Sequence, residues 1–157
     1  MANLEQFLDD SGADSKILFT GLDYAGKSSI ILVLKHEFEN IATLKPTKAA
    51  QRKIFEYIGR SVAEWDLGGQ RTYRMNYLLH PSKYFDNTDV CIYVIDIQDK
   101  LRVLEMLSYF ADVIAQFKKL KITPAINIFL HKYDPEYVEN NQIGINALVS
   151  ELKEKIE

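Results

Sequence analysis

The chain has 157 residues, 47% hydrophobic and 26% charged, which matches one globular domain and excludes a disordered, collagen-like or disulfide-stapled chain. Nineteen Lys and Arg residues against 22 Asp and Glu residues give a net charge of −3, which argues against a nucleic-acid-binding surface. The single cysteine, Cys91, lies in an apolar run and fits a buried thiol in a reducing compartment. We therefore expect a cytoplasmic protein with one sizeable core.

The first third of the chain predicts a strand, a loop and a helix. Residues 15–20 form a short apolar run bounded by Gly21, which is typical of a buried strand. Residues 27–38 have the length of a helix and enough apolar side chains to pack on a sheet. Residues 40–50 show no periodicity and predict a surface loop.

A hairpin and a mobile segment are expected next. Residues 53–58 and 61–66 read as two strands joined by a turn at Gly59 and Arg60, so they should pair antiparallel. A mobile segment is predicted after Gly68 and Gly69.

The second half predicts two more strands and two helices. Residues 90–95 and 125–130 are apolar, strand-like runs. Residues 144–156 place apolar side chains on one face of a last helix. The segment between the two strands predicts a long amphipathic helix, because apolar residues recur there at three-to-four spacing: Leu101, Leu104, Leu107, Phe110, Ile114 and Phe117.

Alternating strands and helices predict the fold class. Such an order favours parallel strands joined by right-handed crossovers. We expect an α/β, three-layer sandwich with a mostly parallel central sheet and one antiparallel strand. Ligands of such sheets bind at the carboxyl ends of the strands, so the loops there carry the candidate site.

Residues 21–28 read Gly-Leu-Asp-Tyr-Ala-Gly-Lys-Ser and match the phosphate-loop pattern G-x-x-x-x-G-K-[ST] between a strand and a helix. Backbone N–H groups and the helix N-terminus there would face phosphate oxygens. Lys27 would contact the β- and γ-phosphates, and Ser28 would bind Mg²⁺. An incidental Gly-Lys-Ser turn is the simpler alternative. The nucleotide-binding residues expected here are Asp23, Tyr24, Ala25, Gly26, Lys27, Ser28 and Ser29.

Residues 65–70, Trp-Asp-Leu-Gly-Gly-Gln, follow the end of a second predicted strand. Asp66 could hold the Mg²⁺ shell, the Gly69 amide could reach the γ-phosphate, and Gln70 could orient the attacking water. These are the parts that GTP hydrolysis requires. A strand that ends in a Gly-Gly turn is the alternative.

Residues 131–134, His-Lys-Tyr-Asp, follow the last predicted strand. The Asp134 carboxylate could accept hydrogen bonds from the N1–H and exocyclic amine of guanine, a pattern that adenine cannot present. Lys132 could lay its methylene stem along the purine. A simple turn at Asp134 is the alternative for this motif alone.

The phosphate loop and the Trp-Asp-Leu-Gly-Gly-Gln motif resemble the Arf branch of the Ras-superfamily small GTPases over about residues 15–135. His131-Lys132-x-Asp134, in place of Asn-Lys-x-Asp, resembles the Rag GTPases. The resemblance implies that Thr47 meets Mg²⁺ and the γ-phosphate, with Thr43 as a competitor. It also implies a GTPase domain over residues 15–157, with a last strand and helix missing through truncation or trimming, and an N-terminal extension or short helix over residues 1–14.

The motifs together predict a guanine-nucleotide switch that binds GTP or GDP with Mg²⁺, hydrolyses GTP slowly, and contacts effectors, exchange factors and GTPase-activating proteins through its switch loops. A nucleotide-bound scaffold or Rag-like heterodimer subunit with little hydrolysis is the alternative, and a P-loop kinase would leave the other two motifs unexplained. Leu4, Phe7 and Leu8 could form an apolar face for peripheral membrane binding, although the surrounding acidic residues would repel anionic lipid.

Overall fold

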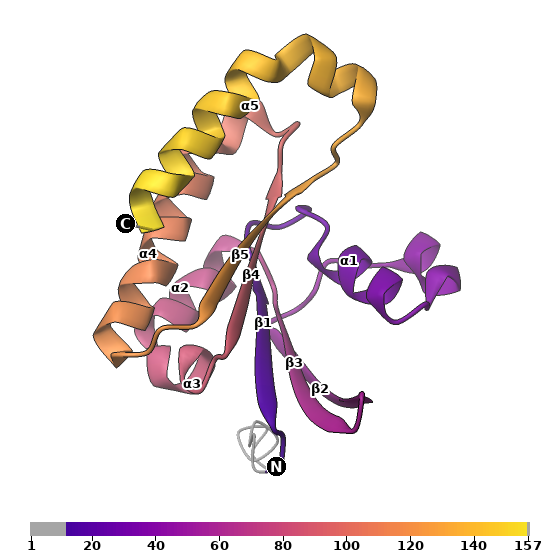
Figure 1. The fold of residues 1–157 in the computed structure, drawn as a ribbon, viewed down its shortest axis with the longest axis vertical. Coiled ribbons are helices and arrows are strands. Elements are labelled where there is room, and N and C mark those ends of the chain that lie inside the picture. Colours follow the sequence, from indigo (N-terminus) through magenta and orange to yellow (C-terminus); the bar gives the residue numbers. More distant parts are fainter. Residues whose placement is uncertain (1–11, 157) are drawn as a thin grey trace.

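The computed structural model describes residues 12–156, which form one mixed five-stranded sheet in the order β2-β3-β1-β4-β5 (Figure 1). Only β2 and β3 pair antiparallel, and every other neighbouring pair is parallel. The predicted α/β class with one antiparallel strand is confirmed. The strands are β1 (Ser15–Thr20), β2 (Ala50–Tyr57), β3 (Arg60–Leu67), β4 (Val90–Asp96) and β5 (Ala125–His131).

Helices cover both sides of this sheet (Figure 1). Helix α1 lies on one side, and α2 to α5 lie on the other, which gives the expected three layers. Within residues 12–156, no helix is long and apolar enough to cross a membrane. The helices are α1 (Lys27–Leu34), α2 (Arg71–Leu79), α3 (Pro81–Phe85), α4 (Val103–Leu120) and α5 (Pro135–Ile156), with short 3-10 helices η2 (Phe38–Thr43) and η3 (Lys100–Arg102).

Two apolar clusters pack against the sheet, one on each face. Successive side chains of a strand point to opposite faces, so Leu18 of β1 joins the larger cluster and Phe19 joins the smaller one. The larger cluster contains Trp65 of β3 and Phe110 of α4, both almost fully buried. The smaller cluster lies under α1 and contains Ile31. These two cores fix the strand ends on which the candidate site is built.

The N-terminal half departs from the predicted elements in three places. Helix α1 ends at Leu34, earlier than predicted. The predicted loop over residues 40–50 overlaps the 3-10 helix η2, which spans Phe38–Thr43. The segment after Gly69, predicted to be mobile, forms α2, which packs Tyr77 completely inside the core. Burial of that aromatic side chain stabilises this short helix, although Met75 and Leu79 on its other side are exposed.

The C-terminal half departs in two places. The predicted apolar stripe of α4 is buried from Leu107 onward, but Leu101 and Leu104 are 98% and 83% exposed. The 3-10 turn η3 precedes α4 and changes the periodicity, so residues before Val103 do not follow the stripe. Helix α5 begins at Pro135, before the predicted start, and has a non-helical residue at Asn141.

The predicted apolar face at Leu4, Phe7 and Leu8 lies outside the described residues. So does most of the expected N-terminal extension, because the description begins at Gly12.

Candidate functional site

The phosphate loop connects β1 to α1 at the carboxyl end of the sheet and depends on glycine at two close approaches. A Cβ on Gly21 would lie 2.4 Å from the Val94 carbonyl oxygen, and one on Gly26 would lie 2.1 Å from His131 Nδ1. Both glycines have positive φ, 140° and 97°, which L side chains rarely adopt. Tyr24, in the same loop, also has a positive φ, 59°, and its side chain is exposed. The loop therefore curls tightly around the space that phosphates would occupy.

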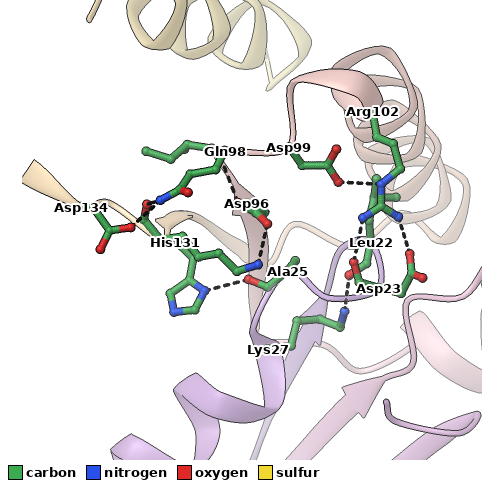
Figure 2. Close-up of polar contacts among 12 residues, drawn as sticks. Leu22, Asp23, Ala25, Lys27, Asp96, Gln98, Asp99, Arg102, His131 and Asp134 are labelled. Atoms are coloured by element: carbon green, nitrogen blue, oxygen red, sulfur yellow. Dashed lines mark hydrogen bonds and ion pairs between the residues drawn. The ribbon is translucent and has the colours of Figure 1, made fainter. Parts of the chain in front are cut away.

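Lys27 is buried inside this loop rather than exposed. Its Nζ donates hydrogen bonds to the carbonyl oxygens of Leu22, at 2.7 Å, and Gly21, at 3.2 Å (Figure 2). Burial lowers the pKa of Lys27 to about 8, although the nearby carboxylates of Asp66 and Asp23 raise it. A buried ammonium group satisfied only by carbonyl oxygens is an attractive site for additional negative charge.

Three oxygen atoms meet next to Lys27. Ser28 Oγ lies 2.5 Å from Asp66 Oδ2 and 2.8 Å from Thr47 Oγ1, and Thr47 Oγ1 donates to Asp66 Oδ2 at 3.0 Å. The structure thus brings together all three predicted metal ligands from α1, the segment before β2, and β3. Thr43, the competitor of Thr47, instead donates to the Asn40 carbonyl within η2.

These oxygens fit a magnesium ion. Asp66 is buried, and its second oxygen, Oδ1, has no hydrogen-bond partner among the described residues. Hard oxygen ligands suit Mg²⁺, which is usually held by one or two carboxylates together with substrate phosphates and water. No cluster of three or more His, Cys, Asp or Glu side chains in the described part could hold a metal alone. Ser28, Thr47 and Asp66 are therefore suited to a cation that arrives with phosphate.

The Gly68-Gly69-Gln70 segment lies directly against the phosphate loop. A Cβ on Gly69 would lie 2.1 Å from the Asp23 amide nitrogen, so only glycine permits this approach. Arg74 Nε donates to the Gly69 carbonyl at 2.8 Å, and Gln70 is the N-cap residue of α2 without a side-chain cap bond. The Gln70 side chain lines a cleft together with Lys27 and Thr47. The predicted hydrolytic residue thus shares one cleft with Lys27 and with two of the predicted metal ligands, Ser28 and Thr47.

The third motif follows β5 and is tied to the phosphate loop. His131 Nδ1 hydrogen-bonds with the Ala25 carbonyl oxygen at 2.8 Å (Figure 2). Lys132 Nζ pairs with Asp96 Oδ2 at 2.6 Å, and Asp134 is exposed. Lys132 and Asp134 do not line the cleft that contains Lys27, but the His131 bond holds their loop beside it. Ser29, the remaining predicted contact, lines the cleft in the first turns of α1.

The sequence of this chain is similar to those of known proteins. A family model described as the ADP-ribosylation factor family matches residues 1–155. The chain belongs to this family. The ADP-ribosylation factor-like protein 3 of Caenorhabditis elegans is 36% identical over 132 residues, which cover 83% of this chain and 67% of that protein. The protein of the same name from Chlamydomonas reinhardtii is 33% identical over 134 residues, which cover 85% and 71%.

Two solved structures share the fold. The mammalian SRP receptor structure has a TM-score of 0.66 at 18% identity and covers 90% of this chain and 72% of that chain. The Arl6 BBS3 small GTPase from Trypanosoma brucei has a TM-score of 0.55 at 17% identity and covers 90% and 98%. As a member of the Arf group of the Ras superfamily, this chain is a small GTPase: it binds guanine nucleotide, hydrolyses GTP and acts as a molecular switch.

Sequence reasoning missed three residues that hold this Arf-family site. Arg102 Nη1 pairs with Asp23 Oδ1 at 2.5 Å, and Gln98 contacts the loop after β5 (Figure 2). Arg74 donates a hydrogen bond to the Gly69 carbonyl. The position of Gln98 and Arg102 in the sequence could have indicated their role. Gln98 and Arg102 follow β4, whose carboxyl end lies between those of β1 and β5 in the sheet. Nothing in the spacing of Arg74 indicates its bond.

Proposed function

We propose that this small GTPase binds the phosphates of GTP at the cleft around Lys27 and holds Mg²⁺ with Ser28, Thr47 and Asp66. The observation that carries the proposal is the convergence of these three oxygens beside a buried lysine at the mouth of a phosphate loop. When bound, Mg²⁺ neutralises charge on the β- and γ-phosphates. Lys27 would exchange its two carbonyl partners for phosphate oxygens, and the Gly69 amide would contact the γ-phosphate.

Gln70 is proposed to orient the hydrolytic water. The water oxygen bonds to the γ-phosphorus, the bond from that phosphorus to the β–γ bridging oxygen breaks, and GDP leaves with the electron pair. One proton of the water passes to an oxygen of the transferred phosphoryl group, which becomes inorganic phosphate. In the described part of the chain, no arginine lines the cleft. Arg102 is paired with Asp23, and Arg74 with Glu105. Without an arginine to stabilise the transition state, we expect intrinsic turnover on the order of 10⁻⁴ to 10⁻² per second.

Guanine is proposed to be read by Asp134. Its carboxylate would accept the N1–H and the exocyclic amine, while the Lys132 stem covers the base. His131 would keep this loop aligned with the phosphates through its bond to Ala25. Tyr24, exposed at the edge of the cleft, would lie close to the bound nucleotide.

The switch itself is proposed to act through Thr47 and the segment from Gly68 to Leu79. GTP would order both around the γ-phosphate, and hydrolysis would release them. Met75 and Leu79 of α2 are 51% and 71% exposed and offer apolar surface to effectors, exchange factors and GTPase-activating proteins.

We place this activity in the cytoplasm, because the buried free thiol of Cys91 fits a reducing compartment. Peripheral membrane binding through Leu4, Phe7 and Leu8 would appear as flotation with neutral vesicles.

Fluorescent-nucleotide titration tests the proposal. Wild type should bind Mg·GTP and Mg·GDP, whereas Lys27→Ala should lose most of the affinity for both while still unfolding cooperatively in urea. Lys35→Ala is a matched control, because Lys35 is a half-buried lysine that pairs with Glu64 but does not line the cleft. Equal binding by wild type and Lys27→Ala would contradict the phosphate-site assignment.

A further inference from the structure

The segment from Asp96, the last residue of β4, to Arg102 contacts both loops that the proposed nucleotide site requires (Figure 2). We call it the brace segment. At one end, Gln98 Nε2 donates to the Lys132 carbonyl oxygen at 2.8 Å and to Asp134 Oδ2. At the other end, Arg102 Nη1 pairs with Asp23 Oδ1, and its Nη2 donates to the Asp23 carbonyl at 3.2 Å. One short stretch of chain therefore holds the base loop and the phosphate loop separately.

The brace segment is held by its own residues. The Gln98 amide nitrogen donates to Asp96 Oδ1 at 2.9 Å, which fixes the backbone from which the Gln98 side chain extends. Asp99 Oδ2 pairs with Arg102 Nε at 2.6 Å, and the Asp99 amide donates to the Asp96 carbonyl at 3.2 Å. Bonds within the brace segment thus fix the backbone at Gln98 and the side chain of Arg102.

The chemistry of the partners decides which end of the Gln98 carboxamide faces Asp134. A backbone carbonyl and a carboxylate both accept hydrogen bonds, so the NH₂ group must face them. One of its hydrogens is used by Lys132 and the other by Asp134, because an NH₂ group has two. The carboxylate of Asp134 keeps Oδ1, which has no partner among the described residues, and retains lone pairs on Oδ2.

We propose that Gln98 is a positioning residue for guanine recognition. This inference rests on the proposed reading of the base by Asp134. An exposed aspartate rotates about χ1 and χ2, yet two guanine donors require both carboxylate oxygens in one orientation. Gln98 fixes one oxygen of Asp134 against the rigid carbonyl of Lys132 and leaves the other open. The base loop is thereby set before the nucleotide arrives.

Inosine diphosphate isolates this role, because inosine has the N1–H of guanine but lacks its 2-amino group. Correct orientation of Asp134 matters more for two donors than for one. Gln98→Ala should weaken GDP binding roughly fivefold to tenfold and inosine diphosphate binding about twofold, so the preference for GDP narrows. Gln98→Glu has the same size but places a second acceptor beside the Asp134 carboxylate, so it should reduce GDP affinity further.

Arg102→Ala is the matched control, since Arg102 belongs to the same segment but contacts only the phosphate loop and Asp99. It should weaken GDP and inosine diphosphate by the same factor and leave the preference unchanged. Urea unfolding midpoints of the nucleotide-free variants show whether each protein folds. The inference therefore depends on a ratio of affinities, which loss of stability alone does not change.

The decisive experiment is competition of GDP and inosine diphosphate against a fluorescent GDP analogue on wild type and the three variants. A narrowed preference in Gln98→Ala with an unchanged preference in Arg102→Ala supports the inference. An unchanged preference in Gln98→Ala overturns it, as does tighter GDP binding, which would make Gln98 an internal competitor for Asp134. A wild type that does not prefer GDP overturns the proposed reading by Asp134 and this inference with it.

Discussion

Lys27 links folding to ligand binding through a pH dependence that the structure defines. Its pKa is about 8 in the folded protein, against an ordinary value of 10.5, because burial disfavours the ammonium form. Between these two values the unfolded chain binds more protons than the folded chain. The free energy of unfolding of nucleotide-free protein should therefore rise as the pH increases, by about 1 kcal/mol between pH 7 and 9.

The assay is urea unfolding of nucleotide-free wild type and Lys27→Met at pH 7, 8 and 9. The difference between the two proteins isolates Lys27, because other titrating groups are shared. Cys91 is one such group: burial raises the pKa of its thiol to about 12, so its ionisation in the unfolded chain lowers stability above pH 9 in both proteins.

Saturating Mg·GDP provides the second arm of this test. Phosphate charge beside Lys27 should keep the ammonium protonated in the folded protein, which removes the rise in stability between pH 7 and 9. Parallel pH profiles for wild type and Lys27→Met would refute the reasoning. So would a wild-type profile that is the same with and without Mg·GDP.

Three further substitutions test individual roles. Ser28→Asn should weaken Mg·GTP more than GDP, because Ser28 faces Thr47 and Asp66 rather than the base; equal losses in a fluorescent titration would remove Ser28 from the metal site. Asp134→Asn should lose roughly tenfold to a hundredfold in GTP affinity and gain relative affinity for xanthosine nucleotides, because the amide replaces an acceptor with a donor. Unchanged GTP binding would mean that the base is read elsewhere. Gln70→Leu should keep Mg·GTP affinity and slow single-turnover phosphate release, and release as fast as in wild type would exclude Gln70 from the chemistry.

The sequence predicted best those elements that local chemistry determines. Strand β1 matches its predicted bounds, because its apolar centre packs on both faces of the sheet, Leu18 in one cluster and Ile17 and Phe19 in the other. The phosphate loop was predictable because its glycines are required by close approaches at Gly21 and Gly26. Ser28, Thr47 and Asp66 were each predicted as metal ligands, and the structure adds that they meet within 3.0 Å of one another.

The features that the sequence did not reveal depend on contacts between distant segments. Helix α2 forms after Gly69 because Tyr77 is buried in the core, a contact that the sequence of this short segment does not specify. Leu104 lies on the exposed face of α4 with Ser108, whereas its neighbours Val103 and Met106 pack against the core. Gln98 and its partner Lys132 are 34 residues apart, and Arg102 and its partner Asp23 are 79 residues apart, so no local pattern predicts these bonds.

The central claim is that this Arf-family chain is a guanine-nucleotide switch, and the nucleotide that co-purifies with it tests that claim most directly. Protein purified in the presence of Mg²⁺ would be denatured, and the released nucleotide identified by chromatography against GDP, GTP, ADP and ATP standards. The account predicts guanine nucleotide in wild type and little or none in Lys27→Ala. Adenine nucleotide in wild type would contradict it.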